Sequence, residues 1–270
     1  MVVVSGLDDA KVSMVTRMVD FTTEGHIAVL TINRPEAKNA VNGDVAAGIE
    51  AGIDALESDD NLWVGILTHA GDVFCAGADL KAINAGQAAA LATAKGGFGG
   101  FVQRERTKPV IVAAEGAALA GGCELALAAD LIVASTGARF GIPEVKRCLV
   151  AAGGGLFRLP RAVPQKVAME LALTGDPISA QRAYEVGLVN RVVEPGQALV
   201  AAKELAAAIC ANAPVAVRES RKIVLAADQK TDAELWAMSG AGFGAAISSE
   251  DATEGLTAFI EKRAPEWKGR

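Results

Sequence analysis

The sequence of 270 residues is poor in the side chains that usually bind metals or form disulfides. It contains two histidines and four cysteines (Cys75, Cys123, Cys148 and Cys210), and no two cysteines are spaced as a CxxC pair. Structural zinc sites need such clustered ligands, so we expect no metal site. Isolated cysteines are also typical of chains whose thiols stay reduced, which favours a cytoplasmic location.

Positive charge and aromatic side chains are scarce as well. Twenty-six Lys and Arg residues against 32 Asp and Glu residues give a formal net charge of −6. Nucleic-acid binding draws on a field of basic residues, so the acidic balance argues against a nucleic-acid partner, although an anionic small ligand needs only a local basic patch. Aromatic residues make up 4% and hydrophobic residues 51%, so a sizeable core must consist mainly of aliphatic side chains.

The chain also lacks a long uninterrupted hydrophobic run. Its most apolar stretch, residues 109–134, contains Glu115, Glu124 and Asp130, and an acidic residue at mid-membrane costs ~3 kcal/mol. The first 15 residues carry an acidic pair and no basic flank, which is unlike a signal peptide. We therefore expect a loose leader over residues 1–15 and no membrane association.

Hydrophobic periodicity predicts alternating strands and helices in the first two-thirds of the chain. Strands are expected at 18–23, 27–33, 63–68, 109–114 and 131–134, and helices at 43–58 and 121–129. Residues 82–100 are rich in Ala and Gly with weak periodicity, which predicts a mobile stretch. Helical patterns dominate beyond residue 155, in segments 155–161, 165–173, 179–186, 198–211, 214–227, 232–239 and 252–263. We expect an α/β core over residues 16–200, followed by a helical region over residues 201–270.

Three short segments combine small residues with carboxylates. Residues 76–81 (Ala-Gly-Ala-Asp-Leu-Lys) follow a predicted strand. A glycine pair precedes Glu124 at a helix start, where unpaired N–H groups and the helix dipole favour negative charge. Pro143 precedes Glu144 in an apolar neighbourhood, where a carboxyl would have a raised pKa and could act as a general acid. Taken singly, the three segments are better explained as a tight connection, a dipole-compensating glutamate and a surface turn, respectively.

Taken together and in order, these segments resemble the crotonase (enoyl-CoA hydratase/isomerase) superfamily. The resemblance covers residues 16–268, with matching motifs at 33–40, 76–81, 121–126, 140–144, 173–176, 183–189 and 259–263. It implies an α/β fold, a crotonase-type spiral of repeated ββα units, with the C-terminal helices forming a trimerisation region. It also implies a homotrimer or a dimer of trimers, an acyl-CoA thioester substrate, and no cofactor apart from the coenzyme A of that substrate.

The resemblance also implies roles for individual residues. The backbone N–H groups of Ala78 and Gly121 would form an oxyanion hole for the thioester carbonyl, Glu124 would deprotonate water, and Glu144 would protonate the α-carbon. Because isomerases usually lack one glutamate, the pair predicts reversible syn hydration of a 2-enoyl-CoA. Coenzyme A contacts are expected from Ala76 (through its carbonyl), Asp79, Leu80, Lys81 and Lys262, the last reaching the ligand of a neighbouring subunit. Both lysines are equally compatible with ordinary surface positions.

The loop after Glu144 departs from the family pattern. Ala151 and Ala152 replace a common Pro-Gly pair, Phe157 adds bulk, and Ile142 replaces an often polar residue. These departures affect the choice of substrate more than the class of enzyme. An enoyl-CoA isomerase, a carnitinyl-CoA dehydratase-like enzyme and a non-catalytic acyl-CoA binding protein stay open as alternatives. The glycine run 153–155 lacks the spacing of a dinucleotide-binding loop.

Overall fold

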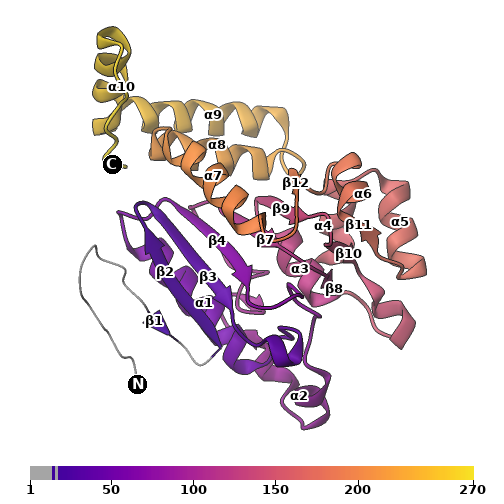
Figure 1. Cartoon of the computed structure of the whole chain (residues 1–270). Coiled ribbons are helices and arrows are strands. Elements are labelled where there is room, and N and C mark those ends of the chain that lie inside the picture. Colours follow the sequence, from indigo (N-terminus) through magenta and orange to yellow (C-terminus); the bar gives the residue numbers. More distant parts are fainter. Residues whose placement is uncertain (1–13, 16–17) are drawn as a thin grey trace.

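The computed structural model describes residues 14–15 and 18–270, and its centre is a mixed β-sheet (Figure 1). Seven strands lie in the order β1-β2-β3-β4-β7-β9-β12. Their bounds are β1 (Met14–Val15), β2 (Val19–Glu24), β3 (Ile27–Ile32), β4 (Val64–His69), β7 (Val110–Ala114), β9 (Leu131–Ser135) and β12 (Arg191–Val193). Pairing is antiparallel from β1 to β3 and parallel from β3 to β12. The expected α/β class is confirmed.

Helices cover both faces of this sheet. On one face, α1 (Gly43–Ser58) packs a stripe of Val45, Ile49, Ile53 and Leu56 into the larger core cluster. On the other face, α7 (Ala198–Cys210) contributes buried alanines to a second cluster. Strands covered on both sides lose the polar–apolar alternation, which is why β4 and β7 are nearly continuous apolar runs.

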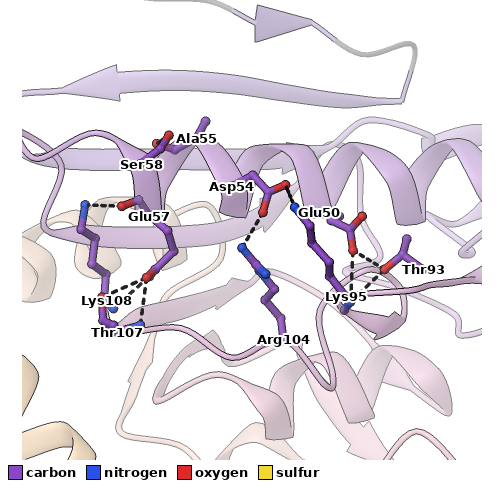
Figure 2. Close-up of polar contacts among 11 residues, drawn as sticks. Glu50, Asp54, Ala55, Glu57, Ser58, Thr93, Lys95, Arg104, Thr107 and Lys108 are labelled. Atoms are coloured by element: carbon purple, nitrogen blue, oxygen red, sulfur yellow. Dashed lines mark hydrogen bonds and ion pairs between the residues drawn. The ribbon is translucent and has the colours of Figure 1, made fainter.

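The segment between β4 and β7 is held against α1 by acidic side chains of that helix. The contacts run from Glu50 to Thr93 and Gly96, from Asp54 to Lys95 and Arg104, and from Glu57 to Thr107 and Lys108 (Figure 2). The segment contains α2 (Leu80–Asn84), η2 (Ala88–Leu91), β5 (Ala92–Thr93) and β6 (Gly97–Phe98). Residues 82–100, whose weak periodicity predicted a mobile stretch, therefore contain short elements held by side-chain contacts.

A second sheet joins segments that follow β7 and β9. Its strands are β8 (Ala118–Leu119), β10 (Arg139–Gly141) and β11 (Ile178–Ser179), and β10 pairs with β8 in parallel. Helix α3 (Gly121–Ala128) follows β8, and the 3-10 helix η3 (Pro143–Arg147) follows β10. The pairing therefore brings the start of α3 close to the start of η3.

Helices make up most of the chain after residue 155. They are α4 (Gly155–Ala162), α5 (Gln165–Thr174), α6 (Ala180–Glu185), α7, α8 (Pro214–Ala226), α9 (Asp232–Ile247) and α10 (Glu250–Glu261). Figure 1 shows α10 at the far end of the α8–α9 pair, opposite α2. The helix expected at 232–239 runs to Ile247, because Gly242 lets α9 pack closely on Glu219 and Ile223 of α8.

Two other expectations concern the ends of the chain and membranes. Most of the predicted leader, residues 1–13, lies outside the described residues, and Met14 and Val15 pair with β2 as strand β1. In the described part of the chain, no single helix has the length and apolarity to cross a membrane. Helices α7 and α8 meet that criterion only as a pair, which is bent by 107°.

Candidate active site

Two tight turns place Ala78 next to Gly121. A parallel bridge between Cys75 and Ala118 aligns the chain segments that lead into the two turns. Gly77 then lies directly against the second turn, since a Cβ at this position would come within 3.0 Å of the Gly121 nitrogen. Its φ of +99° also favours glycine.

The N–H groups of Ala78 and Gly121 donate no hydrogen bond to any residue that the structure describes. Ala78 pairs with Val41, but that bridge uses the carbonyl of Gly77 and the N–H of Asp79. Gly121 is the first residue of α3, where an N–H has no acceptor within the helix. Two adjacent free N–H groups at a helix start can bind an oxygen that develops negative charge.

Ala120, directly before Gly121, has an unusual backbone conformation with φ 52° and ψ −127°. Such a conformation costs of the order of 1–3 kcal/mol for a residue other than glycine and persists only where its surroundings enforce it. Two hydrogen bonds do so here: Ala120 N–H donates to the Gly141 carbonyl (2.9 Å), and Glu124 N–H donates to the Ala120 carbonyl (3.1 Å). The strain therefore fixes the direction of the Gly121 peptide.

Glu124 lies in the first turn of α3 and is only 4% exposed. Its Oε1 accepts a hydrogen bond from Gly155 N–H at 3.0 Å. A Cβ on Gly153 would lie 2.5 Å from Glu124 Oε2, so the glycine run 153–155 forms a close wall around this carboxyl group. Burial raises the pKa of Glu124, and the charge of Glu144 raises it further.

Glu144 begins η3 together with Pro143, which occupies the first turn of that helix. Its Oε2 is buried and finds no hydrogen-bond partner among the described residues. Burial raises the pKa of this carboxyl as well. An unpartnered buried carboxyl oxygen is costly, and the cost is smaller when the group carries a proton, so Glu144 is suited to hold and deliver one.

The two glutamates belong to one site. Their segments meet through the pairing of β8 with β10 and through the Ala120–Gly141 hydrogen bond. Cys123 is buried close to both: burial raises the pKa of its thiol to about 12, and the charges of both glutamates contribute. The structure thus brings the segments that carry Ala78, Gly121, Glu124 and Glu144 together.

Asp79 has a structural role that the sequence did not reveal. One carboxyl oxygen accepts the N–H groups of Lys81 (2.9 Å) and Ala82 (3.2 Å) and so caps the start of α2. The other oxygen forms an ion pair with Arg34 at 2.7 Å. Its N–H donates to the Val41 carbonyl (2.9 Å), and its carbonyl accepts from Ile83 N–H (3.0 Å), so the carboxyl and the backbone of Asp79 are all engaged within the protein.

The other predicted coenzyme A contacts lie on the surface. Ala76 is exposed, and Leu80 and Lys81 are exposed in the first turn of α2, with Leu80 54% accessible. Lys262 caps the C-terminal end of α10, and α10 and α2 lie on opposite sides of the molecule (Figure 1). Within one chain it does not join the site, so its predicted role depends on a neighbouring subunit.

Sequence reasoning gave no role to two side chains that help to build the site, Asn39 and Phe98. Asn39 is fully buried and donates to the carbonyls of Ala70 (2.8 Å) and Val73 (2.7 Å). The 33–40 motif is therefore hydrogen-bonded to the loop that follows β4. Phe98 covers Gly121, since a Cβ on that glycine would lie 2.4 Å from the ring. The 33–40 motif was a visible signal, whereas nothing in the sequence linked residues 98 and 121.

Two of the unusual residues after β10 prove to lie in different environments. Ile142 is buried beside Gly155, whose Cβ would lie 3.3 Å from it. Phe157 is half exposed, with the guanidinium groups of Arg158 and Arg161 at 5.2 Å and 5.4 Å from its ring centre. The ring of Phe157 therefore contacts two guanidinium groups, while Ile142 adds an apolar contact close to the glycine wall of Glu124.

Known proteins are similar to this chain over nearly its whole length. The family model for enoyl-CoA hydratase/isomerase matches residues 22–270. The chain is 41% identical over 245 residues to a short-chain-enoyl-CoA hydratase of Clostridium acetobutylicum, covering 89% of this chain and 93% of that protein. It is 38% identical over 261 residues to a carnitinyl-CoA dehydratase of Proteus mirabilis, covering 94% and 100%. It matches the crystal structure of an enoyl-CoA hydratase from Mycobacterium tuberculosis with a TM-score of 0.90 and 50% identity, over 93% of this chain and 99% of that one. The chain belongs to the enoyl-CoA hydratase/isomerase family.

Proposed function

We propose that this protein is an enoyl-CoA hydratase-type lyase, which reversibly adds water to a 2-enoyl-CoA to form a 3-hydroxyacyl-CoA. The observation that carries the proposal is the buried Glu124 and the half-buried Glu144, whose Oε2 is buried, beside the N–H groups of Ala78 and Gly121, which donate to no described residue. An isomerase moves a proton but activates no water, so it has no need of a second carboxylate. A pure binding protein would carry the desolvation cost of both carboxyls without benefit.

The proposed reaction follows from this geometry. The thioester carbonyl oxygen accepts hydrogen bonds from Ala78 and Gly121 N–H. Glu124 removes a proton from water, the hydroxide oxygen bonds to the β-carbon, and the electrons of the double bond move towards the carbonyl oxygen. Glu144 then gives its proton to the α-carbon, and the carbonyl re-forms. Syn addition requires that both glutamates act on the same face of the double bond, and the proposed reaction uses no cofactor beyond the coenzyme A of the substrate.

The same machinery run backwards removes water from a 3-hydroxyacyl-CoA. The resemblance to a carnitinyl-CoA dehydratase supports this second candidate, whose acyl group would carry a quaternary ammonium. The two candidates differ in the acyl group and share the roles of Glu124 and Glu144.

A substrate panel tests the proposal. The purified protein is incubated with 2-enoyl-CoA thioesters of increasing chain length, and the loss of the enoyl thioester absorbance is followed. Carnitinyl-CoA and a 3-enoyl-CoA are assayed in parallel for dehydration and isomerisation. Turnover of 2-enoyl-CoA supports the hydratase. Isomerisation alone, or saturable acyl-CoA binding without turnover, would overturn it.

The rate of hydration should depend on pH through the two raised carboxyl pKa values. Glu124 must be ionised to accept a proton, so turnover is lost as the pH falls through its pKa. Glu144 must be protonated to donate, so turnover is also lost as the pH rises through its pKa. Because burial raises both, the acidic limb of kcat/KM should lie above ~4.3, the ordinary pKa of glutamate. A rate profile with its acidic limb at the ordinary value would contradict the assignment.

We also infer a cytoplasmic homotrimer or dimer of trimers. All four cysteines are free thiols, which suits a reducing compartment. Large apolar side chains are exposed on the C-terminal helices, namely Val224, Trp236, Phe243, Ile247, Leu256, Phe259 and Ile260. Exposed apolar patches of this kind favour burial between subunits. Light scattering after size exclusion should give three or six times the chain mass of 27.6 kDa, whereas a stable monomer would contradict the inference.

A further inference from the structure

Arg158 joins two segments that meet at the active site. It lies on α4 with a half-buried side chain. Its Nη1 donates to the Gly153 carbonyl at 3.2 Å, and its Nη2 donates to the Val102 carbonyl. The guanidinium lies tightly over Gly154, since a Cβ there would come within 2.1 Å of Nη1. A planar fork can bridge two carbonyls in this way, whereas the single ammonium of lysine cannot reproduce the geometry.

Each of the two bridged segments holds one part of the site. The glycine run 153–155 forms the wall around Glu124 and gives it the Gly155 N–H at 3.0 Å. Val102 ends the segment that begins with Phe98, whose ring covers Gly121. The Arg158 guanidinium therefore connects the glycine run that contacts Glu124 with the segment whose Phe98 ring covers Gly121, a predicted oxyanion donor.

Arg158 is also a charged neighbour of Glu124. Burial raises the pKa of Glu124, the charge of Glu144 raises it further, and the positive charge of Arg158 opposes the rise. Arg147 acts on Glu144 in the same opposing sense, and Arg161 on α4 is a further cation close to Arg158. Of these cations, Arg158 alone combines the charge with hydrogen bonds to the wall of Glu124.

We propose that Arg158 is a positioning residue for the water-activating step: it locks the 153–155 glycine run to Val102 and so holds Glu124 beside the oxyanion donors. This inference rests on the proposed hydratase function. It assigns Arg158 no contact with the substrate, because both hydrogen bonds go to backbone carbonyls of the protein itself.

Three variants test the proposal in the full-length protein. Arg158→Met should lower kcat for a 2-enoyl-CoA by about 10- to 100-fold with KM changed by less than about two-fold, because misplaced catalytic groups have effects of this size. It should also move the acidic limb of the pH–rate profile to higher pH. Arg158→Lys should restore the pH profile but not kcat, since lysine returns the charge without the bridge. Arg161→Met is the control, because Arg161 pairs with Asp228 and stacks on the same Phe157. It should keep kcat within about two-fold.

The outcomes separate the two hypotheses. Absence of turnover in the wild-type protein would overturn the hydratase function. Wild-type kcat in Arg158→Met, or an equal loss in Arg161→Met, would overturn the role of Arg158.

A readout that needs no turnover is the carboxyl infrared band of Glu124, measured in a Glu144→Gln background. In Arg158→Met, the band of the protonated carboxyl should appear at a higher pH than in the protein with Arg158. The same pH of appearance in a folded variant would contradict the proposal.

Discussion

Replacing Glu144 with glutamine should reduce the hydration of a 2-enoyl-CoA by about 10²- to 10⁴-fold, the usual contribution of a general acid. Glutamine has nearly the same shape but cannot deliver a proton to the α-carbon. The thioester would still bind to Ala78, Gly121 and the surface residues of α2, so the Kd for a product acyl-CoA should stay within about three-fold. Stopped-flow absorbance and isothermal titration calorimetry measure the two quantities.

The stability of the same variant gives an independent control. The raised pKa of Glu144 means that the folded state takes up its proton more readily than the unfolded chain. This group therefore stabilises the fold below its unfolded pKa of about 4.3, and the contribution is lost as the pH rises through the folded pKa. Glu144→Gln removes the dependence, so its stability relative to wild type should increase towards neutral pH. Loss of acyl-CoA binding as large as the loss of turnover would instead show that Glu144 is structural.

Replacing Glu124 with alanine should also reduce hydration by about 10²- to 10⁴-fold, but it should spare exchange of the α-proton. Without Glu124 no group removes the proton from water. Glu144 and the N–H groups of Ala78 and Gly121 can still form and reprotonate an enolate. A saturated acyl-CoA in D₂O isolates this half-reaction, because it has no β-hydroxyl to eliminate, and proton NMR follows the exchange.

The pair of variants forms a matched test of the division of labour. Glu144→Gln should lose both hydration and exchange, whereas Glu124→Ala should lose hydration and keep exchange within about ten-fold of wild type. Equal loss of both activities in Glu124→Ala would contradict separate roles. Because Glu124 also accepts the Gly155 N–H, Glu124→Gln should accompany it as a variant that keeps the volume of the side chain.

Long periodic segments were predictable because their signal is local. The stripe of Val45, Ile49, Ile53 and Leu56 predicts a helix over 43–58, and the structure has α1 at Gly43–Ser58. The buried strands β4 and β7 were equally visible as apolar runs. The strands β8, β10 and β11 were missed, because two or three residues are too few to establish a period.

The sequence by itself determined the family, the α/β class and the four residues of the proposed site, since each motif is a short stretch whose spacing is visible along the chain. Tertiary structure alone decided how those residues are held. Asp79 pairs with Arg34, Glu144 Oε2 has no hydrogen-bond partner among the described residues, and the glycine run 153–155 packs against the Glu124 carboxyl. The physical reason is that burial and charge depend on segments that the fold brings together from distant parts of the chain. A local sequence pattern does not predict which guanidinium or aromatic ring contacts the site.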